Sequence, residues 1–128
     1  VVIVPEHGAA LHGDRMQIAG MREIPSPSIT RVPVGIKLVG MGRNPSAAPL
    51  HITEPSSFLA LSEIISRLYS APPQADGEGP NWPALLSNLP QTAAVSENAG
   101  TVVVDYAGKP YIRIKEKAEW LPYPQRFK

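Results

Sequence analysis

Glu6 and His7 stand side by side near the start of the chain, and their side chains are of the types that hold metal ions. A carboxylate oxygen and an imidazole nitrogen are ordinary zinc ligands. Consecutive side chains on a regular strand point to opposite faces, so both can reach one ion only if the chain bends. Pro5 and Gly8 flank the pair and permit that bend. Zinc needs three or four protein ligands, so a solvated loop or a local hydrogen bond remains the alternative for a pair.

Arg22 is the candidate for contact with a phosphoryl group. Its guanidinium offers a planar fork of donors, which suits the charge that a phosphoryl group spreads over its oxygens during transfer. A plain surface cation is the alternative. His12 and Asp14 lie close to the Glu-His pair in sequence, but a solvated loop explains them better. Ser26 and Ser28 lie in a segment that Pro25 and Pro27 are predicted to hold extended and that has no elbow motif, so neither serine is predicted to be a nucleophile.

The elements that must position these residues begin with residues 1–4, an unbroken apolar run. Such a run predicts a strand buried on both faces, as in the middle of an α/β sheet. Ligand-binding groups in these sheets follow the carboxyl ends of the strands, which is where Glu6 and His7 stand. Residues 30–39 alternate in polarity and predict a second strand, in which Pro33 implies an edge position or a bulge.

The rest of the chain predicts two helices and then a hairpin. Residues 58–69 repeat apolar side chains at helical spacing, with Ser56 or Ser57 available as the N-cap. Residues 82–89 predict a short helix that Pro83 opens. Residues 91–100 read as a polar connection, in which residues 96–98 are predicted either to line the site or to form a cap or turn. The β-rich runs at 101–106 and 111–114 predict a hairpin, and residues 119–124 can add a further strand.

Composition describes a globular chain rather than a disordered one. The 128 residues are 43% hydrophobic and 18% charged, and the net charge of +1 gives no reason to expect nucleic acid as a partner. Without cysteine, neither a disulfide nor a thiolate metal site can form within this chain. The chain opens inside a strand pattern with no initiator methionine, which favours a fragment of a longer protein.

Several stretches resemble a known family. Residues 1–8, Val-Val-Ile-Val-Pro-Glu-His-Gly, look like the late metal-binding segment of the alkaline-phosphatase superfamily, where a hydrophobic strand ends in Asp-His-Gly. Glu6 stands at the Asp position. Longer motifs narrow the likeness to the C-terminal part of the cellulose phosphoethanolamine transferases of bacterial cellulose secretion systems; they are residues 5–18, 22–37 and 89–98. This ordered series of motifs is fairly specific, and the likeness as a whole covers nearly the whole chain.

The resemblance implies an α/β fold in which residues 1–128 form the C-terminal part of an alkaline-phosphatase-like catalytic domain. Enzymes of this family use zinc to activate a Ser or Thr nucleophile. The nucleophile takes phosphoethanolamine from phosphatidylethanolamine and passes it to cellulose in the biofilm matrix. By resemblance, Glu6 and His7 are zinc ligands and Arg22 contacts the substrate, while the nucleophile and the other ligands lie upstream. The 128 residues alone are then expected to be inactive.

The resemblance also implies a location and partners. The full enzyme would be anchored in the bacterial inner membrane by upstream helices, with its catalytic domain in the periplasm and other cellulose synthase subunits beside it. Two alternatives stay open. One is a phosphatase or sulfatase of the same superfamily. The other is a non-catalytic envelope module that binds glycan through Tyr111, Trp120 and Tyr123, although these side chains can also simply pack the hairpin.

Overall fold

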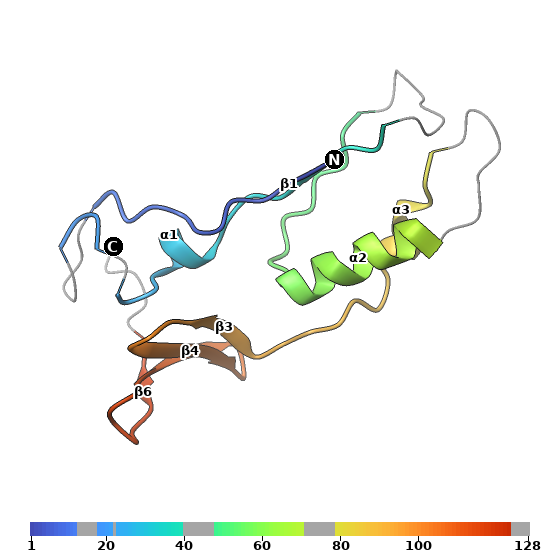
Figure 1. The fold of residues 1–128 in the computed structure, drawn as a ribbon. Coiled ribbons are helices and arrows are strands. Elements are labelled where there is room, and N and C mark those ends of the chain that lie inside the picture. The colour runs from blue at the N-terminus through green and yellow to red at the C-terminus, as the bar shows by residue number, and fades with distance from the viewer. Residues whose placement is uncertain (13–17, 22, 40–47, 71–78, 124–128) are drawn as a thin grey trace. The chain divides into compact units, whose positions relative to one another are not determined.

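The structure is a computed structural model that describes residues 1–12, 18–21, 23–39, 48–70 and 79–123 (Figure 1). Helices and strands are mixed, as the α/β prediction expects, and the larger sheet is antiparallel and four-stranded. The chain forms two compact units, the first from residues 1–2 and 36–92 and the second from 3–35 and 93–128. In chain order the elements are β1 (Val2–Ile3), α1 (Pro27–Thr30), β2 (Gly35–Ile36), α2 (Phe58–Ser70), α3 (Trp82–Leu86), β3 (Ala94–Glu97), β4 (Thr101–Tyr106), β5 (Lys109–Ile114) and β6 (Leu121–Pro122).

Helix α2 follows the predicted pattern closely. The Ser57 hydroxyl accepts a hydrogen bond from the Ala60 amide at 3.1 Å, so Ser57 rather than Ser56 caps the helix. Ala60 and Ile64 are buried and lie one turn apart, whereas Phe58 and Leu59 of the apolar repeat are 59% and 53% exposed. The helix continues to Ser70, one residue beyond the predicted end.

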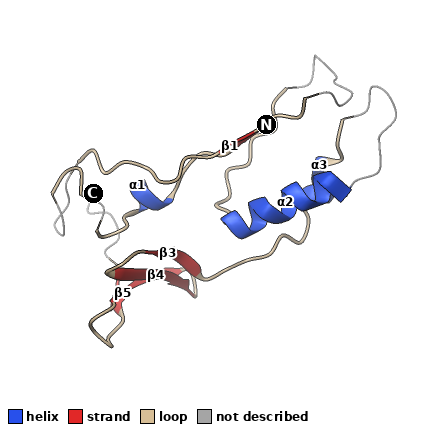
Figure 2. Ribbon diagram, in the orientation of Figure 1, coloured by secondary structure: helices blue, strands red, loops and turns tan. Residues whose placement is uncertain are grey.

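Helix α3 begins as predicted and ends early. The Asn81 side chain caps it by accepting from the Ala84 amide at 3.2 Å, and Pro83 lies in the first turn. The predicted end at residue 89 is wrong, because Ser87 is extended and Asn88 has a left-handed φ of 48°. Figure 2 shows α2 and α3 lying against each other in the first unit.

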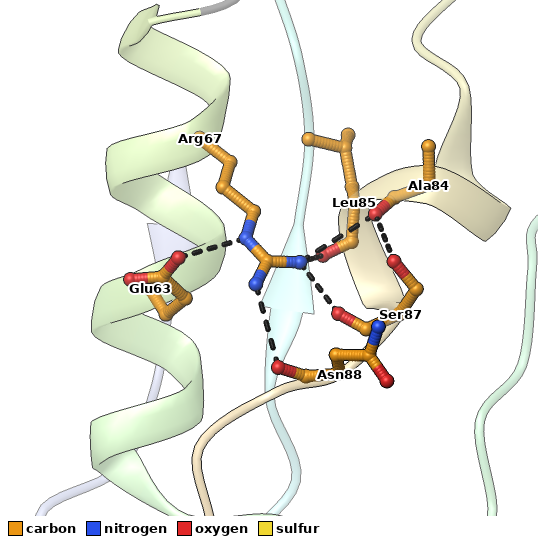
Figure 3. A network of polar contacts seen from close by, with 6 residues as sticks. All are labelled: Glu63, Arg67, Ala84, Leu85, Ser87 and Asn88. Atoms are coloured by element: carbon orange, nitrogen blue, oxygen red, sulfur yellow. Dashed lines mark hydrogen bonds and ion pairs between the residues drawn. The ribbon is translucent and has the colours of Figure 1, made fainter.

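Arg67 of α2 closes the exposed carbonyl end of α3 (Figure 3). Its guanidinium also pairs with Glu63 at 2.8 Å, four residues earlier on the same helix. The last carbonyls of a helix have no partner within the helix, so a fork of donors at that end satisfies them. The carbonyl oxygens within reach belong to Ser87 at 2.6 Å, Leu85 at 3.2 Å, and Ala84 and Asn88 at 3.5 Å.

The second unit is built on a sheet in the order β3-β4-β5-β6. The predicted hairpin of β4 and β5 is confirmed, with Val103 opposite Ile112 in the register. Its turn holds Ala107 at φ 52° and Gly108 at φ 73°. Two positive φ values in a two-residue loop give the turn type whose twist matches the strands. The further strand expected near the end is present as β6, which pairs with β5.

The core of the second unit lies on one face of this sheet. Val103, Ile112 and Tyr123 are buried together there, and Ile24 packs against them. Tyr123 therefore packs the hairpin and does not belong to an exposed aromatic platform. Because consecutive strand residues alternate between faces, Tyr111 and its neighbours on the opposite face point away from this core.

The prediction that residues 1–4 are buried on both faces is wrong for this chain. Their exposed fractions run from 38% to 70%, because β1 belongs to a sheet of only two strands. Val1 and Lys37 exchange backbone hydrogen bonds of 2.7 and 2.8 Å beside it. Such an exchange is the hydrogen-bonded pair of an antiparallel ladder.

Three other expectations are corrected. The predicted strand at residues 30–39 is reduced to Gly35–Ile36, since Thr30 ends the helical turn α1 and Pro33 lacks an amide for a ladder. The segment around Pro27 is helical there rather than extended, because proline suits the first turn of a helix. The polar connection at 91–100 contains strand β3. Within the described ranges, no helix is both long and apolar enough to cross a membrane.

Candidate functional site

Glu6 and His7 lie on the exposed loop that leaves β1. The His7 Nδ1 atom donates a hydrogen bond to the Gly8 carbonyl oxygen at 2.7 Å. A carbonyl only accepts, so the proton of a neutral imidazole lies on Nδ1 and the lone pair lies on Nε2. A backbone carbonyl on one ring nitrogen is the arrangement that orients the other nitrogen of a histidine toward a metal.

Gly8 fixes this loop against the segment that contains α1. Its amide donates to the Ile29 carbonyl at 2.8 Å. A Cβ atom at position 8 would lie 1.9 Å from the Ser28 carbonyl oxygen, a distance that the backbone cannot accept without moving. Only glycine allows the two backbones to approach this closely. The glycine after His7 therefore has a packing reason in addition to the bend that the sequence predicted.

The loop then returns on itself. Ala10 is buried, and its carbonyl oxygen accepts from the Gly20 amide at 2.8 Å. Gly20 has a φ of 83°, a conformation that suits glycine. His12 is exposed in the structure. Asp14 and Arg22 fall outside the described residues, so the structure does not place the predicted phosphoryl contact.

The second and third family-like segments meet through Asn98 and Glu23. The Asn98 side-chain nitrogen donates to the Glu23 carbonyl oxygen at 3.0 Å, and the Thr101 hydroxyl donates to the same oxygen at 3.1 Å. The Asn98 oxygen accepts from the amides of Gly100 and Thr101 at 2.9 and 2.8 Å. Asn98 thus closes the turn between β3 and β4 and tethers the residue that follows Arg22.

Sequence reasoning left Asn98 undecided between lining a site and forming a turn. In the structure Asn98 forms the turn. The sequence around it contained a local signal for this, because an Asn side chain readily accepts a hydrogen bond from the backbone two residues further on. Its bond to Glu23 spans 75 residues and has no local signal. Ser26 and Ser28 hydrogen-bond each other through their hydroxyls at 2.7 Å.

Glu97, the residue before Asn98, forms an ion pair with Lys115. The Lys115 Nζ atom lies 2.6 Å from the Glu97 Oε1 atom. The hydrogen bond from Lys115, and then its positive charge, hold the pKa of the Glu97 carboxyl below its ordinary value of 4.5. Desolvation acts in the opposite direction, and Arg113 adds a smaller lowering effect.

The loop supplies fewer donors than a zinc ion requires. Glu6 and His7 supply an oxygen and a nitrogen donor, both exposed on one loop. In the part of the chain that the structure describes, no group of three or more His, Asp or Glu residues is arranged to hold a metal. The pair therefore fits part of a zinc site, and a complete site needs ligands beyond these two.

Comparison with known proteins identifies the family. The model of the cellulose biosynthesis protein BcsG C-terminal domain matches residues 1–120. The cellulose biosynthesis protein BcsG of Salmonella typhimurium is 55% identical over 125 residues, and that of Escherichia coli K12 is 52% identical over 125 residues. Each alignment covers 98% of this chain and 22% of the relative, so the chain spans about a fifth of their length. The chain therefore belongs to the BcsG C-terminal-domain family of cellulose biosynthesis proteins.

Proposed function

We propose that the chain is the C-terminal part of a zinc-dependent transferase that moves phosphoethanolamine from phosphatidylethanolamine to cellulose. Membership of a cellulose biosynthesis family supports the acceptor. The observation that supports the metal chemistry is the loop at 6–8. There the Gly8 carbonyl orients the His7 imidazole, and the close approach of the Gly8 backbone to residues 28–29 fixes the loop. Such a loop suits one side of a metal site more than it suits a freely solvated turn.

Each residue has a stated role in this proposal. His7 offers Nε2 and Glu6 offers a carboxylate oxygen to the ion. Bound zinc would lower the pKa of a coordinated hydroxyl and neutralise charge on phosphoryl oxygens. Arg22 contacts the phosphoryl group, and the nucleophile comes from another part of the full-length protein. The proposed alkaline-phosphatase-like fold places these groups at one end of a sheet.

The proposal includes a place in the cell. The full-length protein is anchored in the bacterial inner membrane, where its lipid donor resides, and this domain faces the periplasm. In this proposal the other cellulose synthase subunits are its neighbours there. The product is a modified cellulose of the biofilm matrix.

The test is transfer by the full-length protein from headgroup-labelled phosphatidylethanolamine to cellulose, read by mass spectrometry after cellulase digestion. Arg22→Ala is expected to lower the rate by roughly a hundredfold or more, as loss of a donor to a developing oxyanion does. Arg31→Ala is the matched control, since Arg31 is an exposed arginine nearby. Equal loss in both variants would remove Arg22 from the proposal. Faster hydrolysis of simple phosphate or sulfate esters than transfer would favour the phosphatase or sulfatase alternative.

A further inference from the structure

The face of the four-stranded sheet opposite the core carries a line of aromatic and basic side chains. The pairing register shows which residues lie on this face, because residues paired across neighbouring strands point to the same side of the sheet. Tyr111 pairs with Val104 on β4 and with Pro122 on β6, and Arg113 pairs with Val102. We call this surface the outer face; its aromatic members are Tyr106, Tyr111 and Trp120, and its cations on β5 are Lys109 and Arg113.

Four of these side chains form two contacts, one between Arg113 and Trp120 and one between Tyr106 and Tyr111. The Arg113 guanidinium carbon lies 4.9 Å from the centroid of the Trp120 ring. The rings of Tyr106 and Tyr111 have centroids 6.4 Å apart and meet edge to face at 67°. Tyr106 is 71% exposed and Trp120 is 40% exposed. The outer face therefore presents aromatic surface to solvent although it is already ordered, so a ligand would find it preorganised.

Arg113 is the cation that contacts an aromatic ring of this surface. Among the described residues, its buried Nε has no hydrogen-bond partner, and its guanidinium carbon lies over the Trp120 ring. A guanidinium carries five N–H donors. Lys115, which directly follows strand β5, is paired with Glu97.

We propose that the outer face binds a β-1,4-glucan chain and so holds the polymeric acceptor on the protein. This rests on the proposed function, which makes cellulose the acceptor. The chain of a β-1,4-glucan is a flat, uncharged ribbon whose ring faces are lined with C–H groups and whose edges carry hydroxyls. Aromatic rings with polar tips match the faces, and the guanidinium of Arg113, held beside Trp120, offers N–H donors to the hydroxyls of the edges. An aliphatic patch would lack the second kind of contact.

Binding of cellohexaose to the 128-residue chain, followed by calorimetry, tests the inference. Trp120→Ala and Tyr106→Ala are each expected to lower the association constant roughly threefold to tenfold, the value of one stacked ring. Tyr69→Ala is the matched control, because Tyr69 is 89% exposed on α2, outside the outer face. It is expected to bind as the wild type does. Maltohexaose, whose α-1,4 chain curves, is expected to bind more weakly than cellohexaose.

Absence of cellohexaose binding by the wild type would overturn the inference, and so would equal losses in Tyr69→Ala and Trp120→Ala. Because Trp120→Ala also removes support from Arg113, Tyr106→Ala is the decisive variant if the first fails to fold. Unchanged binding in Tyr106→Ala and Trp120→Ala would equally refute it. Chelation of metal tests the two proposals separately, because glucan binding is expected to survive chelation whereas transfer is not.

Discussion

The amide of Gly8 donates to the carbonyl of Ile29 at 2.8 Å, and this bond holds the His7 loop against the segment that contains α1. Its geometry leaves no space for a side chain at position 8, where a Cβ would meet the Ser28 carbonyl oxygen. The first two family-like stretches are thus joined through their backbones. The loop that carries the proposed zinc ligands depends on this approach.

Gly8→Ala is expected to lower the free energy of unfolding by about 1–3 kcal/mol, because the obstacle is backbone and cannot rotate away. Urea denaturation of the chain measures the change. Gly35→Ala is the control, since nothing lies within 4 Å of the added Cβ there. It is expected to stay within about 0.5 kcal/mol of the wild type. Similar results for the two variants would show that the close approach of Gly8 is not needed.

Asn98 is expected to be needed for both the turn and the tether. Asn98→Ala removes the acceptor for Gly100 and Thr101 and the donor to Glu23, so we expect a loss of about 1–3 kcal/mol. Asn98→Asp keeps the turn acceptor but removes the donor to Glu23. We expect amide exchange in the variant to be faster around Glu23 and unchanged at Gly100 and Thr101. Faster exchange at all three sites in Asn98→Asp would mean that turn and tether are not separable.

Arg67 is expected to matter more through the carbonyls of α3 than through its ion pair. Glu63→Gln removes a partly exposed pair and should cost no more than about 0.5 kcal/mol. Arg67→Met also removes the donors to Ser87 and Leu85 and should cost about 1–3 kcal/mol. Thermal unfolding of both variants measures the difference. Equal costs would assign the stabilisation to the ion pair alone.

The ion pair of Glu97 and Lys115 predicts a pH dependence. The pKa of Glu97 is lowered in the folded chain, so its contribution to stability is present above the ordinary value of 4.5. The contribution is lost as the pH falls through the lower pKa of the folded state. In an NMR titration, Lys115→Met is expected to move the Glu97 midpoint upward toward 4.5. An unchanged midpoint would contradict the assigned cause, and Lys117→Met serves as the control.

Local signals in the sequence predicted the elements that local forces form. The apolar repeat and Ser57 placed α2 within one residue of its observed end, and the β-rich runs around the turn at 107–108 placed the hairpin. Helix α1 was missed because Pro27 was taken to stiffen an extended segment, although proline is also favourable in the first turn of a helix. Strand β3 was missed because its residues look polar and its partner β4 decides its form.

The candidate site depends on contacts that no local pattern contains. The residue types of Glu6 and His7 were enough to predict metal-binding chemistry. The orientation of His7 depends on its hydrogen bond to the Gly8 carbonyl, which the sequence does not reveal. The bonds from Gly8 to Ile29 and from Asn98 to Glu23 join segments distant in sequence. The expected burial of residues 1–4 failed for a related reason, because burial depends on neighbouring strands and β1 has only β2 here.

The zinc content of the full-length protein, wild type against His7→Ala, tests the central claim most directly. The account predicts that the wild type retains zinc through purification and that His7→Ala loses it, since Nε2 of His7 is a proposed ligand. His51→Ala is the control, because His51 is an exposed histidine outside the loop sequence, and the variant should keep its zinc. If His7→Ala holds as much zinc as the wild type, His7 is not a ligand and the proposed metal loop is wrong.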